Sequence, residues 1–255
     1  MRQDRRYLLV LTLLLGYLAA LWSMLYAWNG TLTVGSTPVK PSVIIVDAGH
    51  GGFDGGAEAV NGAVEKDINL PIALKLRDLL TVYGFDVIMT RETDTATCDD
   101  GLDSLSQKKT SDILNRFQII EEHPEAVFLS IHQNKYPDAS SFGAQMFYGP
   151  ESPQSQKLAD VLQANFARQL CPENTRQPKP AEDNIYLLYH APIPSVLIEC
   201  GFLSNPDEAA LLCDEKYQDK VAFVIAGSLL QYIEQSAYPQ VPELSAAFSD
   251  SLAGF

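Results

Sequence analysis

Apolar and polar positions follow two alternating patterns from about residue 42 onward. Short apolar runs bounded by turn-forming residues are typical of buried strands, and they occur at 42–47, 85–90, 126–131, 143–148, 184–189 and 195–199. Between them, apolar side chains recur at helical spacing over 65–83, 113–122, 154–170 and 217–233. Apolar strands that alternate with helices predict one α/β domain over 43–236, with a mainly parallel, twisted central sheet flanked by helices.

The N-terminal stretch has a different pattern. Three arginines and one aspartate lie in the first six residues, and residues 7–28 then carry no charge. As a helix this uncharged segment would measure about 33 Å, which is enough to cross the apolar core of a bilayer. We therefore expect residues 1–28 to form a single-pass anchor at the cell membrane, with the arginines in the cytoplasm and the catalytic domain outside it. A cleaved signal peptide is the alternative, although its apolar core is usually shorter.

Two further segments are expected to lie outside the domain. Residues 29–42 are rich in Gly, Thr, Pro and Ser and are typical of a linker. Residues 237–255 are expected to form a loose C-terminal tail. No internal repeat is visible, and so the sequence predicts a single catalytic domain between these segments.

Charge and cysteine content exclude some kinds of function. The chain has a formal net charge of −14, and because the first stretch is basic the remainder is more acidic still. Such a domain lacks the positive charge that nucleic-acid binding requires. Four cysteines show no C-x-x-C spacing, which argues against a zinc knuckle and favours free thiols over disulfides; they are Cys98, Cys171, Cys200 and Cys213.

Chemically active side chains gather at the predicted carboxyl ends of the strands, where open α/β sheets bind ligands. His50 follows the first strand, His132 follows the third, and Glu199 ends the run at 195–199. Glu65 opens the first helix, just beyond a glycine-rich loop. Taken singly, each residue has an ordinary structural explanation, such as a hydrogen-bonded loop histidine or a first-turn acid. Their convergence from four parts of the sequence favours a shared site.

Two histidines and a glutamate form one of the ligand sets of catalytic zinc. Zinc lowers the pKa of a water molecule to about 7 and polarises a carbonyl, and a further carboxylate can accept the proton of that water. We therefore expect His50, Glu65 and His132 to bind Zn²⁺ and Glu199 to act as the base. The glycines around His50 would let metal or substrate approach the backbone. The other two histidines, His123 and His190, are expected to have structural or solvent-facing roles.

Five segments resemble the zinc-dependent N-acetylmuramoyl-L-alanine amidases of bacterial cell walls. They are "DAGHGGFDGGA", "EKDINL", "VIMTRETD", "FLSIHQN" and "VLIECGFLSN", and the likeness extends from about Val43 to Ile233. The resemblance implies the same zinc ligands and the same catalytic glutamate. It also implies peptidoglycan glycan strands with stem peptides as the substrate.

The sequence departs from the family pattern at two positions. Ala48 replaces the proline of the usual Asp-Pro-Gly-His-Gly-Gly opening, which removes no ligand. Pro71 lies early in the first predicted helix, where proline is disruptive beyond the first turn. We therefore expect the regular helix to begin near Pro71, with Glu65 in a preceding turn.

A narrower resemblance points to the membrane-anchored, germination-specific amidases of endospore formers. The segments "IHQNKYPDASSFGAQMFYGP", "PENTRQPK" and "ECGFLSN" carry it. It implies a role in forming muramic lactam in the spore cortex and an activating lipoprotein as a partner. It also implies substrate contacts from Asn134, Arg176 and Lys179, which could bind a stem-peptide carboxylate. A solvated basic patch is an equally good interpretation of the two cations.

The sequence thus predicts a zinc hydrolase that cleaves the amide between N-acetylmuramic acid and L-alanine. One alternative is a non-catalytic wall-binding scaffold on the same fold, but such proteins usually lose a ligand or the catalytic acid. Another is a zinc sugar N-deacetylase, which would release acetate instead of exposing an alanine amine.

Overall fold

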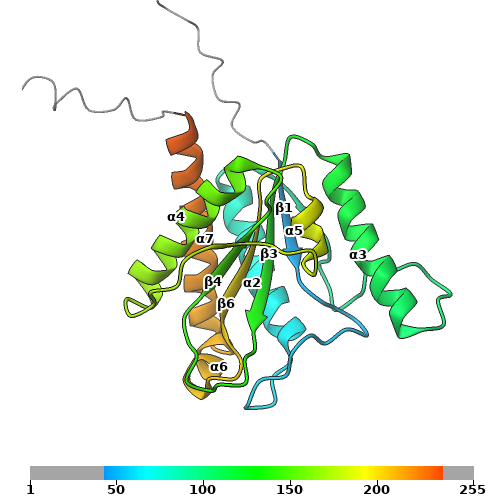
Figure 1. The fold of residues 1–255 in the computed structure, drawn as a ribbon, viewed down its shortest axis with the longest axis horizontal. Helices are drawn as coiled ribbons and strands as arrows, with labels where there is room; N and C mark the ends of the chain where they lie inside the picture. The colour runs from blue at the N-terminus through cyan, green and yellow to red at the C-terminus, as the bar shows by residue number, and fades with distance from the viewer. Residues whose placement is uncertain (1–42, 238–255) are drawn as a thin grey trace, which may run out of the picture. The chain divides into compact units, whose positions relative to one another are not determined.

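The computed structural model describes residues 43–237. These residues form one α/β domain with a six-stranded sheet in the order β2-β1-β3-β6-β4-β5 (Figure 1). The predicted anchor at 1–28, the linker at 29–42 and nearly all of the predicted tail at 237–255 lie outside the described residues. Within the described part of the chain, no helix has both the length and the hydrophobicity needed to cross a membrane.

Parallel strands make up most of the sheet. β1 (Val43–Ala48) pairs in parallel with β2 (Asp86–Met89) and with β3 (Val127–Asn134). β3 pairs in parallel with β6 (Ser195–Phe202), whose other neighbour, β4 (Gln145–Tyr148), is antiparallel. The short β5 (Lys179–Pro180) adds to β4. The mainly parallel sheet predicted from the apolar strands is therefore confirmed.

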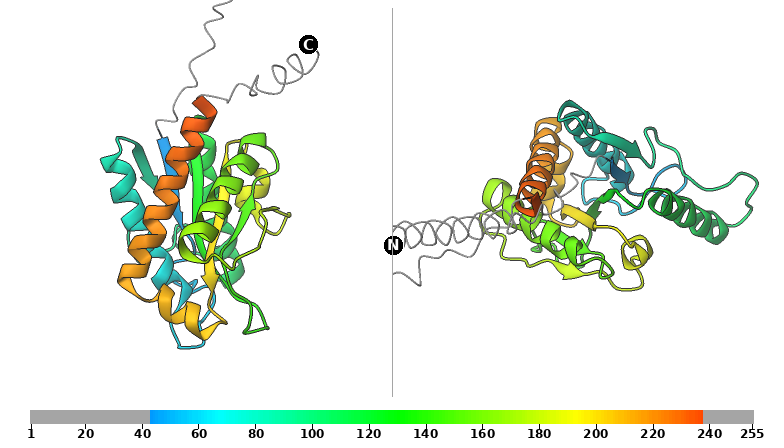
Figure 2. Two further views of the ribbon diagram at one scale, coloured as in Figure 1. Left: turned by 90° about the vertical axis from the view of Figure 1, so that its left-hand side faces the viewer. Right: turned by 90° about the horizontal axis from the view of Figure 1, so that it is seen from above.

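Helices cover both faces of this sheet. α2 (Glu65–Val82), α4 (Pro153–Leu170) and α7 (Glu215–Ala237) pack on one face, with side chains such as Ile72, Leu158 and Ile225 fully buried. α3 (Leu105–Glu122) and α5 (Tyr186–His190) lie on the other face, over a smaller core that contains Phe128 (Figure 2). A short α6 (Pro206–Leu212) follows β6.

Pro71 does not mark the start of the first helix, contrary to the sequence-based expectation. α2 begins at Glu65 and continues through Pro71. Burial of Ile68 and Ile72 on either side of the proline stabilises the helical path, because packing of an apolar face outweighs one lost backbone hydrogen bond. Gly84, with a φ of 81°, follows the helix end as expected.

The strand predicted at 184–189 is also wrong, since residues 186–190 form α5. β6, the next strand along the chain, already pairs with β3 and β4, so neither of its edges is open to this run. It turns into a helix that buries Leu188 against the sheet. The four cysteines form no disulfide, and Cys200 is buried as expected.

Candidate zinc and catalytic site

The loop after β1 places His50 at the carboxyl end of the sheet in an unusual backbone conformation. His50 has a φ of 62°, a left-handed value that only a constrained non-glycine residue adopts. Arg116 donates to the His50 carbonyl oxygen at 2.7 Å, and Arg91 donates to the carbonyls of Ala48 and Gly49 at 2.8 and 3.0 Å. Two buried arginines therefore hold the loop in this conformation.

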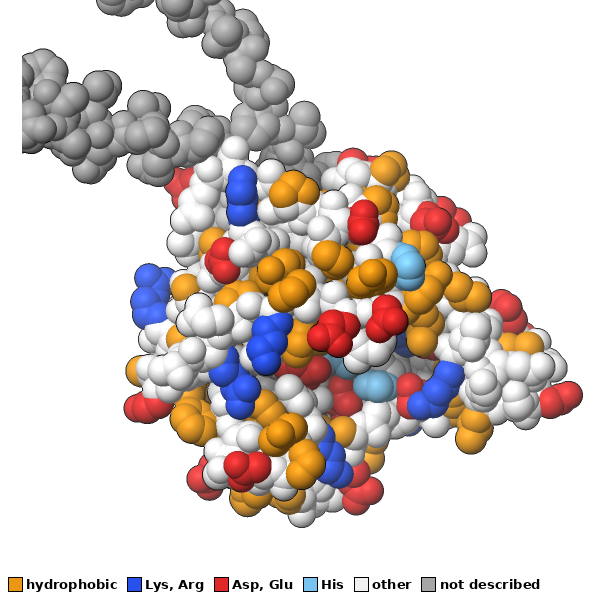
Figure 3. All heavy atoms as spheres, in the orientation of Figure 1, with side chains coloured by type: hydrophobic (Ala, Val, Ile, Leu, Met, Phe, Trp, Pro, Cys, Tyr) orange, Lys and Arg blue, Asp and Glu red, His pale blue; other side chains and the backbone are white. Residues whose placement is uncertain are grey.

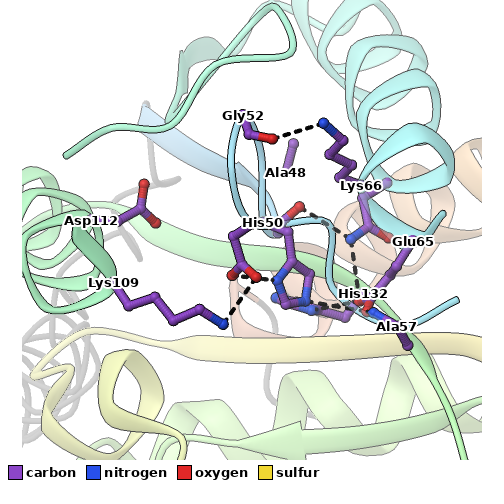
Figure 4. A network of polar contacts seen from close by, with 12 residues as sticks. Ala48, His50, Gly52, Ala57, Glu65, Lys66, Lys109, Asp112 and His132 are labelled. Carbon is purple, nitrogen blue, oxygen red and sulfur yellow. Dashed lines mark hydrogen bonds and ion pairs between the residues drawn. The ribbon is translucent and has the colours of Figure 1, made fainter. Parts of the chain in front are cut away.

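Three predicted ligands meet at this point. His50 Nε2 lies 3.2 Å from Glu65 Oε2, and His132 Nδ1 lies 2.9 Å from Glu65 Oε1. One potential ligand atom from each side chain lies within 4.8 Å of the other two. Figure 4 shows the three side chains pointing toward one another. The prediction that these residues lie together is confirmed.

Asp54 fixes the orientation of the His50 ring. Its Oδ2 lies 2.9 Å from His50 Nδ1, and its Oδ1 pairs with Lys109 at 3.1 Å. A carboxylate on one ring nitrogen leaves the other nitrogen free to ligate, as is usual for metal-binding histidines. Burial lowers the pKa of His50, but hydrogen bonds and charge attraction from Glu65 and Asp54 outweigh it and raise the pKa to about 9. The site therefore attracts positive charge.

Glu65 is buried and held by three groups besides the two histidines. Its oxygens accept hydrogen bonds from the backbone N–H groups of Ala57 and Gln133 at 2.8 and 3.1 Å, and from Asn69 Nδ2 at 3.3 Å. Burial opposes ionisation, but the hydrogen bonds and charges of the two histidines hold the pKa of Glu65 well below its usual range. Glu65 is therefore a fixed carboxylate between two imidazoles.

Glycines leave room for these side chains. A Cβ added to Gly49 would lie 2.3 Å from the His132 ring, and one added to Gly56 would lie 2.5 Å from Glu65 Oε2. The space beside the ligands at Gly49 and Gly56, called the glycine cradle below, therefore accommodates no side chain at either position. Two imidazoles and one carboxylate match a zinc ligand set in chemistry, and the oriented ring of His50 fits it as well.

Glu199 lies beside the three ligands on the neighbouring strand. It is the register partner of His132, so the two side chains share one face of the sheet. Its Oε2 is closed to solvent and has no hydrogen-bond partner among the described residues. Burial is the main cause that raises the pKa of Glu199 to about 7. A buried carboxylate oxygen without a partner is costly, and this is the arrangement expected of a group that acts on substrate.

Cavities lie on both sides of this centre. One, of about 360 Å³, lies between α3 and α5 and is lined by His50, His132 and several apolar side chains. The other, of about 390 Å³, is lined by the three predicted substrate-binding residues, Asn134, Arg176 and Lys179. The structure therefore places these three residues together, near the strand that carries Glu199.

Several residues that build the site carry no role in the sequence-based prediction. Arg91 and Asp54 lie inside the quoted motifs, so the sequence places them in segments of the family pattern but does not indicate what they contact. Arg116 lies on α3, outside the quoted motifs, and no neighbouring residue pattern indicates a role in the site. It pairs with the buried Asp47, which also accepts from Ser130 Oγ at 2.6 Å. As expected, His123 and His190 lie outside the ligand set.

Comparison with known proteins gives a consistent family assignment. Residues 44–231 match the family model described as N-acetylmuramoyl-L-alanine amidase. The chain is 39% identical over 238 residues to the germination-specific N-acetylmuramoyl-L-alanine amidase of Bacillus subtilis, which covers 92% of this chain and 99% of that protein.

Two solved structures show the same fold. The CwlD amidase from Clostridioides difficile, in complex with the GerS lipoprotein, has a TM-score of 0.73 and 42% identity, covering 76% of this chain and 98% of that one. The amidase AmiC2 of Nostoc punctiforme has a TM-score of 0.64 and 26% identity over the same shares of the two chains. This chain therefore belongs to the N-acetylmuramoyl-L-alanine amidase family of enzymes.

Proposed function

We propose that the enzyme hydrolyses the amide between N-acetylmuramic acid and L-alanine with Zn²⁺ held by His50, Glu65 and His132. The observation that carries this proposal is the unpartnered, buried oxygen of Glu199 directly beside a His-Glu-His cluster. When bound, zinc would lower the pKa of a water molecule and polarise the amide carbonyl. The fit of the residues supports zinc because the donor set, the oriented histidine and the glycine cradle all agree.

Glu199 performs the proton transfers in this proposal. Its carboxylate accepts a proton as water adds to the carbonyl carbon of the lactyl group. It then gives that proton to the alanine nitrogen as the carbon–nitrogen bond breaks. The products are a lactyl carboxylate on the sugar and a peptide with a free alanine amine. Asn134, Arg176 and Lys179 contact the substrate in the adjoining cavity.

Its relatives and its N-terminal sequence support a setting for the enzyme. The similarity to a germination-specific amidase supports a role in the spore cortex, including muramic-lactam formation. The structure of a relative in complex with a lipoprotein supports an activating lipoprotein partner here as well. The uncharged residues 7–28 support a single-pass membrane anchor that holds the catalytic domain outside the cytoplasm.

Product analysis tests the proposed reaction. The full chain, supplied with zinc and with a matching lipoprotein, is incubated with purified peptidoglycan in the presence and absence of a chelator. Mass spectrometry should find stem peptides that begin with L-alanine, and the chelator should abolish their release. Release of acetate instead would identify a deacetylase, and binding to glycan with no product despite bound zinc would identify a scaffold.

A further inference from the structure

We propose that Arg176 and Lys179 form a carboxylate-binding subsite for the peptide on the leaving side of the scissile amide. This inference rests on the proposed function, because it assigns the peptide to one side of the reaction centre. It also makes the stem peptide, and not only the amide, a determinant of specificity.

Both cations have free hydrogen-bonding capacity. Arg176 uses Nε to donate to the Phe142 carbonyl at 2.9 Å, and its guanidinium lies 4.5 Å from the centre of the Phe202 ring. Its two terminal nitrogens have no hydrogen bond or ion pair within residues 43–237, and the exposed Lys179 likewise pairs with no carboxylate there. A planar guanidinium with two open nitrogens suits bidentate binding of a carboxylate.

A nearby acid does not neutralise this pair. Glu208 experiences the charge of Arg176, but its two oxygens accept hydrogen bonds from the backbone N–H groups of Gly143 and Phe202 at 2.9 and 2.8 Å. The guanidinium therefore stays available for an external anion. Two cations that form no ion pair within residues 43–237 and share one cavity are unusual in a chain whose net charge is −14.

The segment that carries both cations is held rigidly against β4. Gln145 Nε2 donates to the Gln177 carbonyl at 2.7 Å, and Asn174 Nδ2 donates to the Ala144 carbonyl at 2.9 Å. A Cβ on Gly143 would lie 2.6 Å from the Asn174 side chain, so this glycine permits the close approach. Positions fixed in advance reduce the entropy lost on binding.

The distance from the reaction centre fits a short peptide. Gln145 on β4 is the register partner of Glu199 on β6, and Lys179 lies on β5, one strand further. Lys179 pairs with Phe147, two residues along β4 from Gln145. Two strand spacings combined with this offset amount to about 12 Å between backbones, which an extended chain covers in about three to four residues. The Arg176 guanidinium lies over the ring of Phe202 on β6, the strand that also carries Glu199, so it covers part of this distance. A carboxylate on the second residue of the peptide would therefore lie within range.

The cavity on the other side of the centre is unsuited to a carboxylate. Its arginine, Arg116, already donates to Asp47, Asp112 and the His50 carbonyl. Asp54 and Asp112 add negative charge, and the remaining lining is largely apolar. Figure 3 shows Lys and Arg side chains on both sides of the hollow in which a histidine is visible, and Asp and Glu side chains along its upper edge. The charge distribution thus places the peptide toward Arg176 and Lys179.

Two peptidoglycan fragments that differ only at the second peptide residue test this subsite. In one the free carboxylate of that residue is intact, and in the other it is amidated. The zinc-loaded full chain should prefer the carboxylate form by about tenfold in kcat/KM, mainly through KM. Lys179→Gln and Arg176→Gln should each reduce the preference, through a higher KM for the carboxylate fragment. Lys135→Gln, the same charge change outside the cavity, should preserve it.

Binding of the same two fragments to the Glu199→Gln variant separates this inference from the proposed function. A preference for the carboxylate form that disappears with Lys179→Gln supports the subsite, even if neither fragment is cleaved by the wild type. Absence of cleavage with zinc bound would count against the proposed reaction. Equal affinity for the two fragments, or an unchanged preference in Lys179→Gln, would overturn the subsite. The exposed Lys179 side chain forms no hydrogen bond or ion pair with the described residues, so its substitution should leave the fold intact.

Discussion

Glu199 lies directly opposite His132 across the pairing of β6 and β3. Paired residues of parallel strands face the same side of the sheet, about one strand spacing apart. Glu199, whose buried Oε2 has no hydrogen-bond partner within residues 43–237, therefore lies beside a candidate metal ligand. Sheet register, and not loop conformation, sets this relationship. A water molecule held at the ligand cluster would be within reach of Glu199 without movement of the backbone.

Zinc should stabilise the folded chain through the three ligands. A metal that binds only the native state at 100 times its Kd adds about 2.7 kcal/mol to the free energy of unfolding. Thermal unfolding should therefore shift upward with zinc and downward with a chelator in the wild type, and His50→Ala should abolish the shift. His123→Ala, at a histidine outside the cluster, serves as the control. An equal zinc response in His50→Ala and the wild type would show that the metal binds elsewhere.

Metal binding should require glycine at position 56 because a side chain there would displace the ligands, and not only because of the backbone conformation. Gly56 and Gly62 have φ values of 72° and 85°, so alanine strains the backbone at both, by about 1–2 kcal/mol. Only at Gly56 would the new Cβ displace ligands, since the position at Gly62 has no atom within 4 Å. Urea unfolding should show the loss from backbone strain for Gly62→Ala and a larger loss for Gly56→Ala, where the clash adds to the strain. Titration against a competing chelator should show at least about a tenfold loss of zinc affinity for Gly56→Ala alone. Equal affinities would contradict the cradle.

Asp47 should make the stability of the domain depend on acid pH. Burial opposes its ionisation, but Arg116 and the hydroxyls of Ser130 and Thr90 lower the pKa of Asp47 to about 2 from an ordinary value of 3.8. Because the folded-state pKa is lowered, the stabilisation is complete above about pH 4 and is lost as the pH falls toward 2. The amount is on the order of 2 kcal/mol.

Asp47→Asn tests this dependence, measured by urea unfolding in a chelator so that zinc release does not contribute. At neutral pH the variant should be less stable by about 3–5 kcal/mol, since Arg116 remains buried without its carboxylate. The difference from the wild type should shrink between pH 4 and pH 2. A difference that stays constant over this range would show that the pKa of Asp47 is not lowered.

The sequence predicted the sheet and the four central residues for a physical reason. Strands such as 43–48 are buried on both faces, so they read as continuous apolar runs whose carboxyl ends can be located. A histidine or glutamate at such an end stands out against the apolar background, as Glu199 does in "SVLIECGF". The helical spacing around Leu76 was equally clear, and α2 lies where this spacing placed it.

Contacts between distant segments could not be predicted in this way. Arg116 reaches the His50 carbonyl from a helix 66 positions further along the chain, and no local pattern distinguishes it from a surface arginine. The run at 184–189 was predicted as a strand because its apolar residues fit both the two-residue period of a strand and the 3.6-residue period of a helix. Its helical form could be recognised only from the structure, in which both edges of β6 are already paired. Pro71 was misread because burial of Ile72 and its neighbours depends on the sheet beneath them.

The central claim is most directly tested by measuring zinc content and turnover together in Glu199→Gln. This variant keeps the size and shape of the side chain and leaves the three ligands intact. We predict about one zinc per chain, unchanged thermal unfolding, and a loss of at least about 100-fold in the release of peptides that begin with L-alanine. Glu151→Gln, at an exposed acid, should retain full activity. Turnover within a few fold of the wild type in zinc-loaded Glu199→Gln would contradict the assignment of Glu199 as the proton-transferring group.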